Sequence, residues 1–114
     1  MKTIKLILLA AVALISTNLF AQTKTDTIKV WGNCGMCESR IEKALKMEGV
    51  TKATWDSDTQ LLIVTYDESK TSNDLIQKKV ASVGHDTDKY AADDKAYSKL
   101  PGCCKYDRKE KTKG

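Results

Sequence analysis

The sequence of 114 residues has few aromatic residues (6%) and no marked excess of one charge over its central part. Basic residues exceed acidic ones by four, and this excess lies at the two ends. Lys2 and Lys5 lie near the N-terminus, and residues 105–114 hold five cations against two anions, which leaves residues 22–104 close to neutrality. Without a basic face or interleaved aromatic residues, this part lacks the usual features of a nucleic-acid-binding surface. We therefore expect no nucleic-acid partner.

Long apolar runs are also missing, apart from one near the N-terminus. Leu6–Ile15 is a run of ten apolar residues preceded by Lys2 and Lys5. The run is too short to cross a bilayer as a helix and is typical of a secretory signal peptide. We predict a signal peptide at residues 1–21, cut after Ala21, with an uncleaved anchor as the alternative. No later stretch could enter a membrane after cleavage, so we expect the mature protein in the periplasm.

The length allows one domain with a tail and excludes most enzymes that need two lobes around a cleft. From Gln22 onward only about one third of the residues are apolar, which is enough for one modest core. The chain has four cysteines, and in an oxidising compartment cysteines ordinarily suggest disulfides.

Hydrophobic periodicity predicts four strands and two helices. The strands alternate polar and apolar residues or are rich in β-branched ones, and a glycine ends each helix. The predicted strands are 25–30, 50–55, 61–66 and 87–90, and the predicted helices are 37–48 and 75–83. This order, βαββαβ, indicates an α+β ferredoxin-like sandwich, with two helices on one face of a four-stranded antiparallel sheet. Residues 91–100 suggest a further short helix, and we expect the charged tail after Cys104 to be disordered.

The most informative motif is Cys34-Gly35-Met36-Cys37, which lies between the first predicted strand and the first predicted helix. A two-residue spacer lets both sulfurs converge on one point, and a helix N-terminus favours anions and so thiolates. Thiolates bind soft metal ions, but two are too few for structural zinc, which takes four ligands. The motif therefore indicates a site for Cu(I) or Hg(II), which accept two soft ligands in a nearly linear arrangement.

Two other interpretations of this motif stay open. The first is a local disulfide between Cys34 and Cys37, which would fit a disulfide-stapled interaction module. The second is a thiol–disulfide oxidoreductase, because a redox motif of this kind also follows a strand, opens a helix and often has a tryptophan before it, as Trp31 is here. However, thioredoxin-like folds place a cis-proline opposite the motif, and Pro101, the only proline, lies in the tail.

The run WGNCGMCESRIEKAL, followed by Gly-Val, a strand that ends in TYD and a second helix that ends in VGHD, resembles the heavy-metal-associated domain family. This family includes copper chaperones, metal-binding modules of copper-transporting P-type ATPases and periplasmic mercuric-ion binding proteins. The resemblance covers about residues 25–90 and implies a ferredoxin-like fold. It also implies that Cys34 and Cys37 are the metal ligands, and that the ion passes to a partner by ligand exchange.

The sequence departs from the usual family pattern around this motif. Gly32 and Asn33 stand where the family usually has Met and Thr, and we expect Trp31 to fill the space that this Met occupies. Met36 stands where a small residue is common, so it offers either a thioether ligand or a hydrophobic lid. These departures leave the fold intact but leave the identity of the metal open.

Other residues are accessory candidates. The only histidine, His85, is most simply a solvent-exposed loop residue, and the alternative is a neutral imidazole near the metal. Cys103 and Cys104 are adjacent, and adjacent cysteines rarely bond to each other. They could extend the site to three or four thiolates, form a second site or pair with another chain. Arg40 and Lys43 form an ordinary solvated helix face, or else lower the cysteine pKa values or meet an acidic partner.

Together these observations predict a signal peptide at 1–21, a heavy-metal-associated domain at 22–92 and a C-terminal extension at 93–114 that carries Cys103 and Cys104. We expect a monomeric periplasmic metal-binding protein rather than an enzyme. Its first expected cargo is Cu(I), with Hg(II) or Zn(II) as alternatives. The expected partners are a metal donor or acceptor protein, or a membrane transporter.

Overall fold

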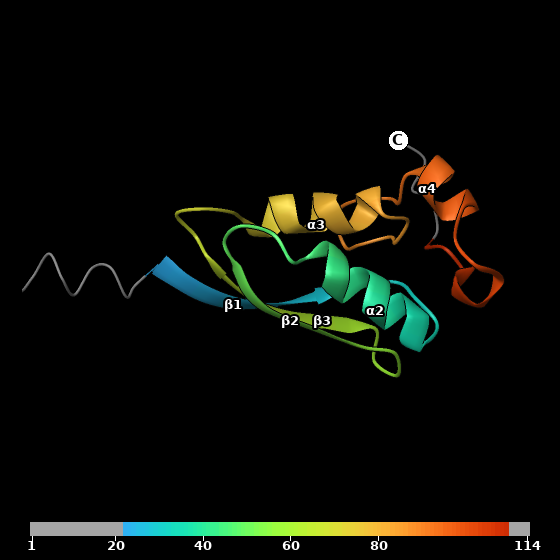
Figure 1. Cartoon of the computed structure of the whole chain (residues 1–114), viewed down its shortest axis with the longest axis horizontal. Coiled ribbons are helices and arrows are strands. Elements are labelled where there is room, and N and C mark those ends of the chain that lie inside the picture. The colour runs from blue at the N-terminus through green and yellow to red at the C-terminus, as the bar shows by residue number, and fades with distance from the viewer. Residues whose placement is uncertain (1–21, 110–114) are drawn as a thin grey trace, which may run out of the picture.

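The computed structural model describes residues 22–109 (Figure 1). The predicted signal peptide and the last five residues lie outside this range. The elements, in chain order, are β1 (Thr23–Lys29), α2 (Gly35–Ala44), β2 (Val50–Asp56), β3 (Leu61–Asp67), α3 (Asn73–Ser82), α4 (Asp94–Ser98) and the 3-10 helix η2 (Gly102–Cys104). The first three predicted strands and both predicted helices are therefore confirmed, and α4 confirms the short extra helix. Within residues 22–109, no helix has the length and apolar character needed to cross a membrane.

The sheet has β3 at its centre, paired antiparallel with β1 on one side and β2 on the other. Alternation along β3 sends Leu62, Val64 and Tyr66 into the core, while Ile63 between them is 51% exposed. Side chains alternate between the two faces of a strand, so one face of this sheet is buried and the other is open to solvent. Helices α2 and α3 cover the buried face (Figure 1).

The predicted fourth strand at 87–90 is not confirmed, because the described residues contain a three-stranded sheet. The segment makes one antiparallel bridge, between Thr87 and Val30. The chain then turns at once, since the Thr87 N–H donates to the carbonyl of Tyr90. Gln77 of α3 holds this turn, because its side-chain oxygen accepts from the Thr87 hydroxyl and from the Lys89 N–H. A turn closed in this way cannot continue along β1.

The core lies between the sheet and the two helices, and Trp55 of β2 lies at its centre with 1% exposure. The Trp55 indole N–H donates to the carbonyl of Val30 at 3.0 Å. A Cβ added to Gly32 would come within 2.8 Å of the Trp55 ring, so this loop can pack there only as glycine. Trp55, rather than Trp31, therefore occupies the space beneath the loop, while Trp31 is only partly buried beside the Lys29 and Lys109 ammonium groups.

The expectation of a disordered tail is wrong for residues 105–109. Tyr106 is 2% exposed and belongs to the core. Its hydroxyl donates to the carbonyl of Gly84 and accepts from the N–H of Asp86. Arg108 forms ion pairs with Asp86 and Asp94. The charged composition of the tail therefore gave no indication of the buried Tyr106 or of the ion pair between Arg108 and the buried Asp86.

Asp26 of β1 is bonded to the central strand β3 and to helix α3, and it gives a test of the fold. The Tyr66 hydroxyl donates to its carboxylate at 2.6 Å, and the Asn73 amide donates at 2.9 Å. The Asn73 bond first, and then the Tyr66 bond, hold the pKa of Asp26 below its usual value. Its stabilising effect is thus fully present above about pH 4 and is lost as the pH falls through this lowered pKa.

We expect Asp26→Asn to lower the free energy of unfolding by about 1–2 kcal/mol at pH 7, because two charge-assisted hydrogen bonds weaken. Urea unfolding of both proteins at pH 7 and pH 3 measures this. The difference in the free energy of unfolding between the two proteins should narrow at pH 3. The reason is that position 26 carries a titrating carboxylate in the unchanged protein and a neutral amide in the variant. A gap of the same size at both pH values would contradict the assignment.

Candidate metal centre

Cys34 and Cys37 lie at the N-terminal end of α2. Cys34 is the N-cap residue with an extended backbone, and its carbonyl accepts the first helical hydrogen bond, from the Glu38 N–H. Their sulfurs lie 3.9 Å apart and both thiols are free. Cys37 is fully buried, whereas Cys34 is partly exposed. The structure thus brings the two sulfurs together, with one of them open to an incoming ion.

The loop before the motif is held from two sides. Trp55 packs beneath it at Gly32. From the other side, the Trp31 N–H donates to the Asp86 carbonyl, and the Trp31 carbonyl lies 2.8 Å from Nδ1 of His85. Because both flanks are fixed, the two thiols are presented from a rigid base, as a binding site requires.

A third thiol joins this pair from the other end of the chain. The Sγ atoms of Cys34, Cys37 and Cys104 all lie within 4.8 Å of one another. Cys104 is fully buried at the end of η2. Among residues 22–109, this cluster is the only group of three or more His, Cys, Asp or Glu side chains whose ligand atoms lie close enough together to hold one metal ion.

Cys103 and Met36 lie together beside the cluster rather than in it. The two are exposed, and the Cys103 thiol lies 3.2 Å from the Met36 sulfur. The Cys103 carbonyl accepts from the Cys34 thiol at 3.4 Å. Adjacent Cys103 and Cys104 therefore point to different environments, one to the surface and the other to the cluster.

Cys34 and Cys104 differ in acidity. The backbone N–H groups of Cys37 and Met36, at the start of α2, face Cys34 and lower its pKa to about 7, with burial acting against them. Burial raises the pKa of the Cys104 thiol, and the nearby Cys37 sulfur raises it further. The partly exposed Cys34 is thus present as a thiolate more easily than the buried Cys104.

The simplest expectation for His85, an exposed loop residue, is wrong. His85 is fully buried, and its ring stacks on Tyr106 with centroids 5.2 Å apart. Burial has the largest effect on the pKa of His85 and lowers it, and the charge of Arg40 lowers it further. The bond to the Trp31 carbonyl acts in the opposite direction but does not outweigh them, so the ring is neutral at pH 7. A neutral ring bonded to a carbonyl through Nδ1 donates its proton there. His85 therefore positions the loop, and it is not among the clustered ligands.

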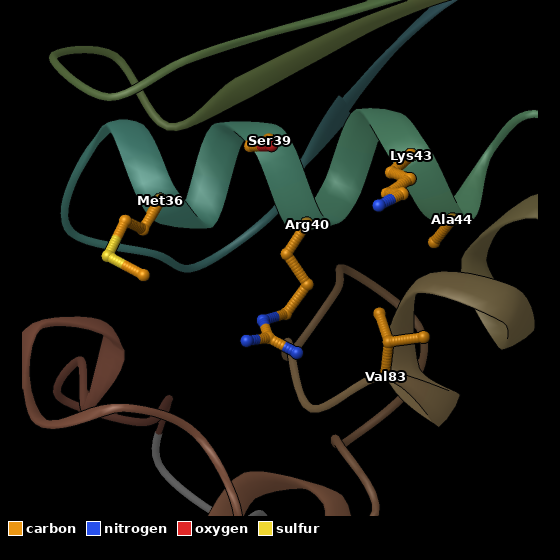
Figure 2. Close-up of a pocket in the computed structure, with 6 residues that line it drawn as sticks. All are labelled: Met36, Ser39, Arg40, Lys43, Ala44 and Val83. Carbon is orange, nitrogen blue, oxygen red and sulfur yellow. The ribbon is translucent and has the colours of Figure 1, made fainter.

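Arg40 and Lys43 border a hollow of about 450 Å³ beside the cluster, between α2 and the end of α3 (Figure 2). Met36 lies at one end of this hollow, and Val83 faces it from the C-terminal end of α3. Lys43 is exposed, as a solvated face predicts. Arg40 differs, because its Nε is buried without a hydrogen-bond partner among residues 22–109. The charge of Arg40 acts on His85, whose pKa it lowers, and neither Arg40 nor Lys43 contributes to the lowered pKa of Cys34.

Sequence reasoning missed the residues that bring Cys104 to the cluster, namely Tyr106, Arg108 and Asp86. The one signal for them was an aromatic residue, Tyr106, inside an otherwise charged tail. Such a residue commonly docks onto a core, but nothing in the sequence names its partner.

Comparison with known proteins agrees with the fold and with the motif. Residues 33–86 match the heavy-metal-associated domain family. The chain is 34% identical over 83 residues to the mercuric transport protein periplasmic component of Serratia marcescens, which covers 71% of this chain and 91% of that protein. It is 37% identical over 87 residues to the protein of the same name from Shewanella putrefaciens, over 75% of this chain and 93% of that protein.

Solved structures give the same result. The CopZ metallochaperone superposes with a TM-score of 0.54 and 30% identity, over 56% of this chain and 98% of that one. Oxidized MerP from Ralstonia metallidurans CH34 gives 0.54 and 36%, over 57% of this chain and 93% of that one. The resemblance seen in the sequence is thus confirmed. The strands and helices have a ferredoxin-like arrangement, two cysteines lie at the start of α2, and the curated relatives are matched over nearly their whole length. This chain therefore belongs to the heavy-metal-associated domain family.

Proposed function

We propose that this protein is a periplasmic carrier that captures one soft heavy-metal ion at Cys34 and Cys37 and passes it to an acceptor. The observation that carries this proposal is the pair of free sulfurs 3.9 Å apart at a helix N-terminus, one buried and one partly exposed. Relatives that match most of the chain are named for the periplasm and for mercuric transport, which supports the compartment and the role.

Capture begins at Cys34, because this thiol is accessible and its pKa is lowered to about 7. An ion bound there lies next to Cys37, whose sulfur already accepts from the Asn33 N–H at 3.4 Å. Each thiol that binds releases its proton, and the oxidation state of the metal does not change. Release follows when a thiolate or thioether of the acceptor, a protein or a membrane transporter, replaces the accessible Cys34 sulfur.

The cargo belongs to the class of ions that thiolates prefer, with Cu(I) and Hg(II) as its members here. Our sequence-based expectation was Cu(I), and similarity to the CopZ metallochaperone supports it. The names of the curated relatives support Hg(II). Titration of the reduced protein with each ion, while a chelator buffers the concentration of the free ion, separates these candidates. We expect the physiological ion to have the lower dissociation constant relative to its buffered free concentration.

We expect Cys34→Ser and Cys37→Ser each to weaken soft-metal binding by at least about tenfold, because each removes a primary ligand. Competition against a chelator under reducing conditions measures the dissociation constant. Cys103→Ser is the matched control, since it removes one exposed thiol and leaves the clustered sulfurs in place.

The same variants test the rival oxidoreductase. Weak metal binding by the unchanged protein, together with rapid turnover of a disulfide substrate that disappears in Cys34→Ser, would overturn the carrier. A protein isolated from its own compartment without free thiols would instead support the disulfide-stapled module.

A further inference from the structure

The segment 100–109, which we call the C-terminal strap, crosses the end of the sandwich next to the N-terminus of α2 (Figure 1). It lies outside the family match, which ends at residue 86. Three of its side chains are buried: Leu100 at 5% exposure, Cys104 at 0% and Tyr106 at 2%. The strap is therefore a packed part of the structure, and its buried thiol lies between two buried side chains, those of Leu100 and Tyr106.

Tyr106 is the anchor on one side of Cys104. Its hydroxyl bonds to Gly84 and Asp86, and its ring stacks on His85. The Tyr97 hydroxyl also donates to the Tyr106 carbonyl at 2.7 Å, with the two rings edge to face. These contacts tie the strap to the same loop residues that hold the Trp31 backbone before the cysteine motif.

Arg108 is the second anchor. Its guanidinium bonds to both oxygens of Asp86, to the Ala92 carbonyl at 2.7 Å and to Asp94. The Asp86 carboxylate is 1% exposed, so this pair is buried on the acidic side and removal of either partner would leave an uncompensated group. The register of the strap, and with it the position of Cys104, is thus fixed within two and four residues of the thiol.

The spacing of the sulfurs fits three ligands around one ion. An ion about 2.3 Å from each of three sulfurs in one plane separates them by about 4.0 Å, whereas two sulfurs on opposite sides of it lie about 4.6 Å apart. Cys34 and Cys37 lie 3.9 Å apart, and Cys104 lies within 4.8 Å of both. A trigonal site would need Cys104 to approach by at most about 0.8 Å, and a linear site would need Cys34 and Cys37 to separate by about 0.7 Å. Small side-chain movements therefore suffice for a trigonal site, in which Cys104 is already within reach of the ion.

We propose that Cys104, carried by the C-terminal strap, is the third thiolate ligand of the soft-metal ion held by Cys34 and Cys37. This inference rests on the proposed metal-binding function and specifies its ligand set. Binding joins three sulfurs to the ion and releases each thiol proton still present to solvent, with no change in oxidation state. Cys103 is not a ligand, because its sulfur lies at the surface beside Met36.

In a site with three sulfurs, the C-terminal strap covers the bound ion on a side that would be open to solvent if only Cys34 and Cys37 held it. Cys37 and Cys104 are fully buried, so an acceptor can approach only through the partly exposed Cys34. Transfer then has to break two buried bonds after the accessible one. We therefore expect slower release than from a site with Cys34 and Cys37 alone.

X-ray absorption at the copper edge tests the ligand count directly, with one equivalent of Cu(I) bound to the reduced, purified protein. We expect three sulfurs for the unchanged protein and for Cys103→Ser, and two for Cys104→Ser. Two sulfurs in the unchanged protein would overturn the proposal. Three sulfurs retained in Cys104→Ser would also overturn it, because another thiol, from Cys103 or from a second copy, would then be the ligand.

Affinity and release rate give a second measurement. We expect Cys104→Ser to weaken Cu(I) binding at least about tenfold and to speed transfer to a chelator, with Cys103→Ser unchanged in both. Equal affinity and transfer rate in the two variants would argue against a bond to Cys104. Because a buried serine can disturb packing, Cys104→Ala serves as a second variant, and the ligand count of the unchanged protein needs no variant at all.

Arg108→Ala tests the strap as a positioning device without removing any thiol. We expect its Cu(I) site to lose the third sulfur in part, and Arg108→Lys to restore it partly through the ion pair with Asp86. A full count of three sulfurs in Arg108→Ala would show that the anchor does not set the position of Cys104.

These outcomes separate the two proposals. Tight Cu(I) binding through two sulfurs, lost in Cys34→Ser and unchanged in Cys104→Ser, leaves the carrier in place and removes the third ligand. Absence of tight binding of either Cu(I) or Hg(II) by the unchanged protein removes both.

Discussion

The site depends on the contact between Trp55 and the backbone at Gly32. The indole ring fills the space directly beneath the loop, at a distance that excludes any side chain at position 32, and its N–H fixes the Val30 carbonyl. A large rigid side chain that is both packed and hydrogen-bonded restricts the loop more than either interaction alone. Because this loop leads straight into Cys34, the position of both motif thiols follows from a residue of β2 that is far away in the sequence.

His85 extends the same constraint to the C-terminus. Its Nδ1 proton goes to the Trp31 carbonyl, and its ring face packs against Tyr106. A charged ring would be costly in this buried position, and burial accordingly lowers its pKa. One neutral imidazole thus joins the loop that carries the first two thiols to the strap that carries the third. Asp86, which precedes the single bridge at Thr87, adds a further link to the strap through its ion pair with Arg108.

The sequence was enough to predict the elements whose signals are local. The alternation in β3, the glycines after both helices and the spacing of Cys34 and Cys37 each depend on neighbouring residues alone. The remaining features depend on contacts between distant residues. The burial of His85 requires Tyr106, and the position of Cys104 requires an ion pair between Arg108 and Asp86, 22 residues apart. Trp31 was the obvious candidate to fill the missing methionine's space, but Trp55 enters it from another strand.

A three-thiolate site inside a small sandwich raises the question of how so much negative charge is accommodated. The electrostatic cost of three neighbouring thiolates, two of them buried, is large without the ion, and burial keeps Cys104 protonated in its absence. The cost falls when the cation is present, because its charge offsets that of the ligands and each sulfur gains a bond. The backbone N–H groups of Met36 and Cys37 at the start of α2 add positive potential beside Cys34. The fold therefore accommodates Cys104 as a neutral thiol when no ion is bound, and a thiolate becomes favourable at this position only when the metal binds.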